Sequence, residues 1–144
     1  MSELLLLNGP NLRLLGQREP EIYGTETLLD VETAVRAEVA DRRWKVTAIQ
    51  SDSEAELIRI IEEHYETVGL ILNPGALMMA GWSLMDALKS YPQPWIEVHI
   101  SNVWAREAFR HESVLSAVAD GVIVGLGTAG YALAARALLG KVAS

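Results

Sequence analysis

The chain has 144 residues, of which 50% are hydrophobic and 22% are charged, and its formal net charge is −7. These values are typical of one globular domain, and the acidic balance argues against general nucleic-acid binding, which requires a basic surface. Cysteine is absent, which excludes disulfides, a thiolate metal site and a cysteine nucleophile, and fits a cytoplasmic location. No apolar run approaches the roughly 20 residues of a membrane span, and the opening residues lack the pattern of a signal peptide.

Five short apolar runs predict the buried strands of a sheet. Each run ends at polar residues or glycines, where the chain is expected to turn. The runs are residues 4–7, 46–49, 68–72, 95–100 and 121–124. Strands that are apolar along their whole length are typical of parallel sheets, which are covered by helices on both faces.

Helical patterns lie between the predicted strands. Thr27 with Asp30, and Ser53 with Glu56, resemble the capping pairs that begin helices, and segments 81–91 and 129–142 also have helical character. The alternation predicts an α/β fold that is flavodoxin-like, with five parallel strands in the order 2-1-3-4-5. We expect residues 1–144 to form a single domain. The long segment 8–26 fits no element, so we expect an active-site lid around residues 16–26.

The sequence GLGTAG at 125–130 matches the G-x-G-x-x-G pattern of dinucleotide-binding turns. Such a site also needs an acidic residue about 20 positions later, and none follows. The motif therefore predicts a tight turn whose glycines let a helix pack closely on a strand. His64, His99 and His111 are the only histidines, and because no two of them have a spacing typical of metal ligands, no metal site is expected.

Glu97 and His99 are two positions apart in the fourth predicted strand, so their side chains point to the same face. Both lie near the carboxyl end of that strand, where open α/β sheets bind ligands. A carboxylate beside a histidine fixes the histidine's tautomer and suits it to general-acid chemistry. The alternative is a buried pair that only satisfies its own charges.

The predicted lid contains Arg18 and Tyr23. A guanidinium that stabilises a phenolate makes the tyrosine a candidate general base, and the alternative is an exposed tyrosine beside a surface arginine. Arg106 and Arg110 are four positions apart, and with Arg18 they would form a positive site for an anionic substrate. The alternative for this second pair is ion pairing with neighbouring glutamates on the surface.

Three asparagines lie at or near the ends of predicted strands: Asn8, Asn11 and Asn73. They are candidates for ligand contacts, with turn formation as the alternative, because asparagine is common in turns. The ends of parallel strands meet at one edge of the sheet, so all the candidates named above are expected to converge there.

Five motifs, in the same order along the chain, resemble those of the type II 3-dehydroquinate dehydratases: LLNGPNLRLLGQREPEIYG, QSDSEAEL, ILNPGAL, IEVHISNVWAREAFRHES and GVIVGLGTAGY. The resemblance implies a flavodoxin-like hydro-lyase of the shikimate pathway that uses no cofactor and no metal. Its substrate is a small anionic cyclohexanone carboxylate. The resemblance also implies a homo-oligomer, a dodecamer built as a tetramer of trimers.

In that family the reaction is an anti-elimination of water through an enolate, and the matching positions acquire roles from the resemblance. Tyr23 removes the proton alpha to the ketone, and Arg18 stabilises the phenolate. Asn11 orients a water molecule that stabilises the enolate. His99, supported by Glu97, protonates the departing hydroxyl.

The resemblance also assigns a set of substrate-binding positions. The backbone amides of Ile100 and Ser101 hold the substrate carboxylate, while Asn73 and Arg110 contact ring hydroxyls. The remaining positions are Gly75, Ala76, Met79 and Asp86, the last of which reaches a neighbouring subunit.

One stretch departs from the family pattern. Most members carry Thr-His-Thr-Ser where this chain has Met-Met-Ala-Gly at 78–81, and the family histidine, at the position of Met79, contributes a hydrogen bond to a ring hydroxyl. Methionine donates no hydrogen bond. Trp82 and Trp104 also replace smaller or more polar residues.

The resemblance predicts dehydration of 3-dehydroquinate to 3-dehydroshikimate, for aromatic amino acid biosynthesis or a related pathway. The first alternative is the same enolate chemistry on a modified, less hydroxylated cyclohexanone carboxylate. The second is a non-catalytic anion-binding or assembly protein, which the intact Arg18, Tyr23 and His99 argue against.

Overall fold

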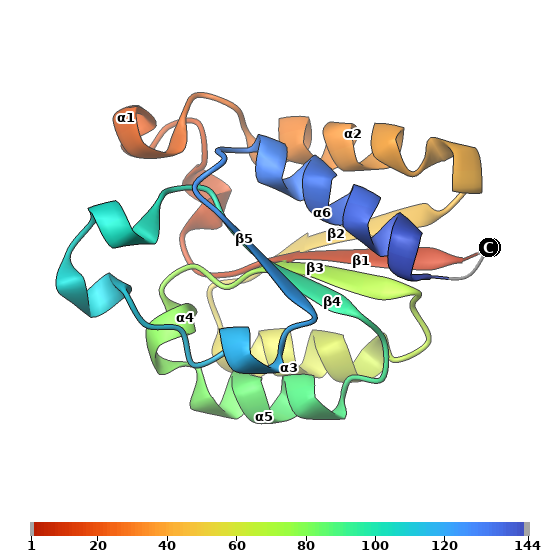
Figure 1. Cartoon of the computed structure of the whole chain (residues 1–144). Coiled ribbons are helices and arrows are strands. Elements are labelled where there is room, and N and C mark those ends of the chain that lie inside the picture. Colours follow the sequence, from red (N-terminus) through yellow and green to blue (C-terminus); the bar gives the residue numbers. More distant parts are fainter. Residues whose placement is uncertain (1, 143–144) are drawn as a thin grey trace.

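Five parallel strands form one sheet in the order β2-β1-β3-β4-β5 in this computed structural model, which describes residues 2–142 (Figure 1). The strands are β1 (Glu3–Asn8), β2 (Lys45–Gln50), β3 (Gly69–Asn73), β4 (Trp95–His99) and β5 (Gly121–Val124). Every neighbouring pair is parallel. The predicted fold class and strand order are confirmed, and the predicted strand bounds agree to within one residue.

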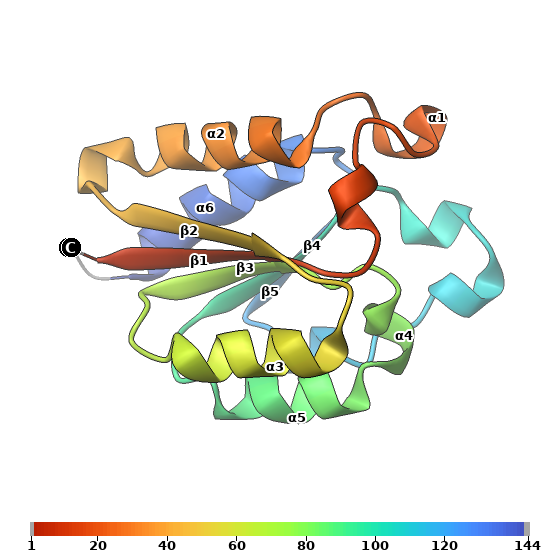
Figure 2. The same cartoon turned by 180° about the vertical axis from the view of Figure 1, so that it is seen from behind.

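Helices cover both faces of the sheet (Figures 1 and 2). On one face lie α2 (Leu28–Glu38) and α6 (Ala129–Lys141), and on the other lie α3 (Glu54–Glu63) and α5 (Trp82–Ser90). The four leucines of β1 alternate between the two layers, as side chains of a strand must. Leu4 and Leu6 pack with the first pair of helices, whereas Leu5 and Leu7 pack with the second.

Two helices begin at the predicted capping residues. Thr27 and Asp30 form a reciprocal capping box at the start of α2. The side chain of Ser53 accepts a hydrogen bond from the backbone N–H of Glu56 at the start of α3. Each cap satisfies backbone groups that the first helical turn leaves unpaired.

Short elements gather at the carboxyl edge of the sheet (Figures 1 and 2). The predicted lid contains the one-turn helix α1 (Pro20–Tyr23), preceded by a 3-10 turn at Leu12–Leu14. A second one-turn helix, α4 (Leu77–Ala80), precedes α5. The segment with Arg106 and Arg110 is not one helix: two 3-10 turns, Val103–Ala105 and Ala108–Arg110, flank an extended Arg106.

The GLGTAG segment is a tight turn, as predicted. Gly125 and Gly127 have φ angles of 85° and 65°, a region that glycine enters without steric cost. A Cβ atom at Gly130 would lie 3.2 Å from a methyl carbon of Ile123 and 3.3 Å from one of Val98, so glycine lets α6 lie close to β4 and β5. Among the described residues, no helix is both long enough and apolar enough to cross a membrane.

Candidate active site

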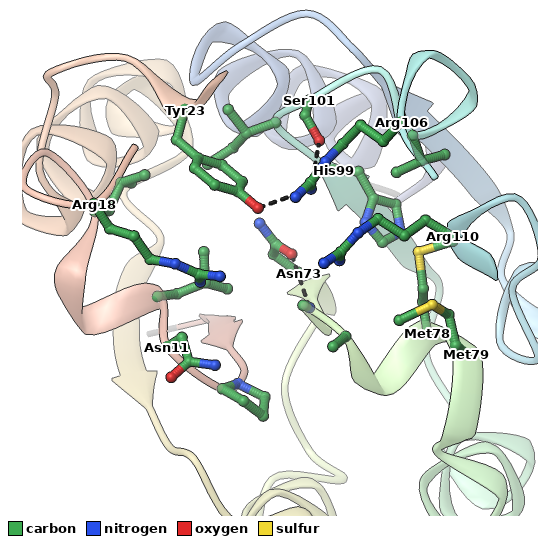
Figure 3. Close-up of a pocket in the computed structure, with 17 residues that line it drawn as sticks. Asn11, Arg18, Tyr23, Asn73, Met78, Met79, His99, Ser101, Arg106 and Arg110 are labelled. Atoms are coloured by element: carbon green, nitrogen blue, oxygen red, sulfur yellow. Dashed lines mark hydrogen bonds between the residues drawn. The ribbon is translucent and has the colours of Figure 1, made fainter. Parts of the chain in front are cut away.

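A cavity of about 280 Å³ opens at the carboxyl edge of the sheet (Figure 3). Its walls come from the ends of β1, β3 and β4, from the lid and from the loop that follows β4. The cavity is lined by eleven of the thirteen residues predicted for the site: Asn11, Arg18, Tyr23, Asn73, Gly75, Ala76, Met79, His99, Ile100, Ser101 and Arg110. The remaining two are Glu97, which lies behind His99, and Asp86, which is exposed on α5.

Tyr23 faces the cavity from α1, and its phenol oxygen accepts a hydrogen bond from Arg106 (Figure 3). The distance from Nη1 of Arg106 to that oxygen is 2.8 Å. The same nitrogen lies 3.3 Å from the hydroxyl oxygen of Ser101. Arg18 is on the other side of the tyrosine, with its guanidinium carbon 5.6 Å from the ring centroid.

The direct hydrogen-bond partner of the phenol oxygen is therefore Arg106, whereas the sequence pointed to Arg18 as the guanidinium that stabilises the phenolate. Arg106 was expected only as part of a positive site. A donated hydrogen bond from a guanidinium stabilises negative charge on the acceptor oxygen. The sequence carries no periodic signal for this contact, because Tyr23 lies on a one-turn helix and Arg106 in a loop, and the two are 83 positions apart.

His99 and Glu97 are buried at the end of β4 and form a hydrogen bond between Nε2 and Oε2. Glu97 is fully buried, and two further donors satisfy its carboxylate. The hydroxyl of Ser116 donates at 2.8 Å and that of Ser113 at 3.1 Å. With Nε2 engaged by Glu97, the other ring nitrogen of His99 is the one available to a ligand.

Ser113 and Ser116 were not found by sequence reasoning. A carboxylate predicted to be buried, such as that of Glu97, indicates that hydrogen-bond donors must lie nearby. The signal does not say which residues supply them: Ser113 lies in a loop and Ser116 begins a short 3-10 turn, neither of which has a periodic pattern.

Asn11 lines the cavity and is held by Asp52, which lies in the loop that follows β2. It adopts a left-handed conformation with a φ angle of 69°. Its backbone N–H donates a 2.9 Å hydrogen bond to Asp52, which also forms an ion pair with Arg13. The hydrogen bond from Asn11 is the largest cause of the lowered pKa of Asp52.

Three guanidinium groups line one cavity, those of Arg18, Arg106 and Arg110. Arg110 also forms an ion pair with Glu107, and its hydrogen bond lowers the pKa of that carboxyl. Surface pairing and cavity lining, which were alternatives at Arg110, thus occur together. The cavity is positive within an acidic chain, which suits an anionic ligand.

Met78 and Met79 form an apolar wall of the cavity, on α4 (Figure 3). Met78 is 5% exposed and Met79 is half-buried. Both border the cavity, so neither is only core filler. Trp82 and Trp104 are 62% and 60% exposed and do not line it.

In residues 2–142, no group of three or more histidine, aspartate or glutamate side chains is arranged to hold a metal ion. The lining instead supplies acid–base and hydrogen-bonding groups. Such a fold and lining are those of an α/β enzyme of the acid–base type.

Comparison with known proteins identifies the family. The family model for dehydroquinase class II matches residues 2–139. The chain therefore belongs to the class II dehydroquinase family, and the resemblance seen in its motifs is confirmed.

Individual relatives cover nearly the whole chain. The 3-dehydroquinate dehydratase of Janthinobacterium sp. (strain Marseille) is 51% identical over 140 residues, which is 96% of this chain and 97% of the relative. That of Bacillus subtilis (strain 168) is 47% identical over 142 residues, which is 98% of this chain and 96% of the relative. The crystal structure of the type II dehydroquinase from Butyrivibrio crossotus DSM 2876 has a TM-score of 0.92 at 40% identity, covering 96% of this chain and 97% of that one.

Proposed function

We propose that the protein is a 3-dehydroquinate dehydratase that removes water from its substrate through an enolate and forms 3-dehydroshikimate. The family and the relatives support this activity. The main observation behind the proposal is that one cavity holds two hydrogen-bonded pairs. One is Tyr23 with Arg106, and the other is His99 with Glu97. One pair suits proton removal and the other suits proton donation.

In the first step, Tyr23 acts as a phenolate base. It takes the proton from the carbon alpha to the ketone, and the electron pair of that C–H bond moves toward the ketone oxygen to form the enolate. Arg106, which donates to the phenol oxygen, stabilises the phenolate, and Arg18 adds positive charge on the other side of the ring. Asn11 orients a water molecule toward the enolate oxygen.

In the second step, the enolate returns to the ketone as the carbon–carbon double bond forms and the carbon–oxygen bond breaks. His99 gives a proton to the departing hydroxyl, which leaves as water. Glu97 orients His99, and Ser113 and Ser116 hold Glu97 in place.

The remaining residues bind the ring. The backbone amides of Ile100 and Ser101 hold the substrate carboxylate, while Asn73 and Arg110 contact ring hydroxyls. The turn at Gly75 and Ala76 and the side chain of Met79 complete the wall, and residues 16–26 act as a lid. In this proposal the chain assembles into a dodecamer, a tetramer of trimers, and the exposed Asp86 contributes to the site of a neighbouring subunit.

The apolar wall favours a second candidate of the same chemistry. A ring hydroxyl placed against Met78 and Met79 loses its water without gaining a partner, because neither side chain donates a hydrogen bond. A substrate without that hydroxyl avoids this cost. The second candidate is therefore dehydration of a less hydroxylated cyclohexanone carboxylate.

An ultraviolet assay for the conjugated enone product tests both candidates. Wild-type protein is given 3-dehydroquinate and, in parallel, a panel of its deoxy analogues. Higher kcat/KM with dehydroquinate supports the first candidate, whereas higher kcat/KM with one deoxy analogue supports the second. Absence of enone from every compound would contradict the proposed enzyme activity.

A further inference from the structure

Asn8, Asn73 and Tyr131 form a buried chain of hydrogen bonds beneath the cavity floor. The two asparagines lie opposite each other at the ends of β1 and β3. Tyr131 comes from the first turn of α6 and is fully buried. Its hydroxyl oxygen lies 2.6 Å from Oδ1 of Asn8 and 2.8 Å from Nδ2 of Asn73.

A backbone group fixes the direction of the whole chain of hydrogen bonds. The N–H of Gly75 can only donate, so the atom of Asn73 that faces it, at 3.1 Å, must be the amide oxygen. The amide nitrogen of Asn73 therefore faces Tyr131, whose oxygen accepts. The single hydroxyl hydrogen of Tyr131 remains for Asn8. Burial raises the pKa of Tyr131, so that hydrogen stays in place across the working pH range.

This fixed direction determines which atom of the Asn73 amide faces the cavity. Asn73 lines the cavity, and its amide nitrogen carries two hydrogens, of which Tyr131 takes one. Figure 3 shows this nitrogen in the middle of the ring of lining residues, with the amide oxygen turned toward Gly75. The amide of Asn73 thus offers the ligand a donor, and its acceptor oxygen already has a backbone partner.

From this geometry we infer that Tyr131 is a positioning residue, which locks the Asn73 amide so that the cavity presents a hydrogen-bond donor to an acceptor oxygen on the substrate ring. The inference rests on the proposed function, because Asn73 is the residue proposed to contact the ring. Tyr131 touches no substrate atom and acts only through Asn73. Without its hydroxyl, the Asn73 amide loses the acceptor that holds its nitrogen and keeps only the hydrogen bond from the Gly75 N–H to its oxygen, so it is held less firmly.

The first test compares two variants that each remove one buried phenol hydroxyl, Tyr131→Phe and Tyr91→Phe. Tyr91 is a matched control because it is also buried, its phenol hydroxyl hydrogen-bonds Thr67 at 2.8 Å, and it does not line the cavity. Initial rates with dehydroquinate give kcat and KM for each variant, and thermal melting gives stability. Both variants should melt at a lower temperature than wild type.

We expect Tyr131→Phe to raise KM about tenfold while kcat stays within about twofold, which is the pattern of lost ground-state binding. Tyr91→Phe should leave both constants unchanged. Equal kinetic constants in the two variants would overturn the inference and leave Tyr131 as a structural residue only.

A double-mutant cycle distinguishes a positioning role from a purely structural one, because only a positioning role makes the effect of Tyr131→Phe on KM depend on Asn73. Tyr131→Phe is measured again in an Asn73→Ala background, where there is no amide to position. We expect no further rise in KM there. If KM rises by the same factor in both backgrounds, Tyr131 does not act through Asn73. If Tyr131→Phe does not fold, Asn8→Ala takes its place in the cycle. That change removes the acceptor of the Tyr131 hydroxyl hydrogen, which can then turn toward Asn73 and disturb the hydrogen bond that holds the Asn73 amide nitrogen.

The wild-type protein separates this inference from the proposed function. Calorimetry with dehydroquinate, alongside the rate assay, reports binding without requiring turnover. Wild type that neither binds nor converts dehydroquinate contradicts the proposed function, and the inference falls with it. Wild type that binds or converts it, with Tyr131→Phe and Tyr91→Phe indistinguishable, contradicts the inference alone.

Discussion

Arg106 donates a 2.8 Å hydrogen bond to the phenol oxygen of Tyr23, although 83 positions separate the two residues. The contact joins the lid to the loop that follows β4, and Arg106 continues from there to Ser101. One guanidinium thus links the proposed base to the proposed carboxylate-binding turn. The first predictions therefore concern Tyr23 as the proposed base, and the relative contributions of Arg106 and Arg18 to its activity.

Replacing Tyr23 with phenylalanine should abolish turnover and leave the fold unchanged. The phenol oxygen is the proposed base, and general-base catalysis typically contributes about 10²- to 10⁴-fold. Steady-state kinetics measures the loss, and circular dichroism with thermal melting serves as the control for folding. A Tyr23→Phe protein with near-normal kcat would contradict the assignment.

The two arginines beside Tyr23 should differ in their effect on kcat. Arg106→Ala removes a charge-assisted hydrogen bond to the phenol oxygen, and such bonds contribute about 1.5–3 kcal/mol, or roughly 10- to 150-fold. Arg18→Ala removes a charge that lies beside the ring and makes no hydrogen bond to that oxygen, so its effect should be smaller. Rates measured under identical conditions decide the matter, and an equal or larger loss in Arg18→Ala would return the leading role to Arg18.

His99→Ala should separate the two half-reactions. Without an acid the hydroxyl is a poor leaving group, yet Tyr23 still forms the enolate. We expect the alpha proton to exchange with solvent deuterium while no enone accumulates, as followed by nuclear magnetic resonance. If exchange and elimination fall by the same factor, His99 is not a separate acid.

The apolar wall should control which ring the enzyme prefers. Met79→His, combined with Met78→Thr and Ala80→Thr, supplies donors on α4 and should shift preference toward dehydroquinate by about 1–3 kcal/mol in transition-state terms. The measurement is the ratio of kcat/KM for dehydroquinate and a deoxy analogue, before and after substitution. An unchanged ratio in a folded variant would show that the methionines do not set specificity.

Asp52 should make the stability of the chain depend on pH in the acidic range. Its folded-state pKa is lowered, chiefly by the hydrogen bond from Asn11, so its contribution is present above the unfolded value of about 3.9 and disappears as pH falls through the lower folded value. An Asp52→Asn variant lacks this titration. The difference in melting temperature between wild type and variant should therefore shrink as pH falls below about 4. A difference that stays constant from pH 7 to pH 3 would rule this out.

The sheet could be predicted from the sequence because its three inner strands, β1, β3 and β4, are buried on both faces. Leu4 to Leu7 form an unbroken apolar run, and parallel strands with helices on both sides require such runs. The convergence of most site residues could also be predicted, because the carboxyl ends of parallel strands meet at one edge of a sheet. His99 and Asn73 converge for this reason.

The contacts that could not be predicted join irregular segments. Arg106 reaches Tyr23 between a lid and a loop, and Ser113 and Ser116 reach Glu97 from a second loop. No periodic pattern encodes such pairings. Tyr131 lies in a segment that was predicted only to have helical character, and its proposed role depends on the direction of hydrogen bonds, which no sequence pattern records.

The proposed base and acid are anchored to the chain in unequal ways. His99 lies on an interior strand, β4, with a fully buried carboxylate behind it. Tyr23 lies on a one-turn helix that has no buried residue, and Arg106 ties its phenol oxygen to the body of the protein. In the proposed mechanism, opening of the predicted lid to release product would remove the base and leave the acid where it was. On this proposal a complete set of catalytic groups is assembled anew in each cycle, and formation of the Arg106–Tyr23 hydrogen bond marks the completed set.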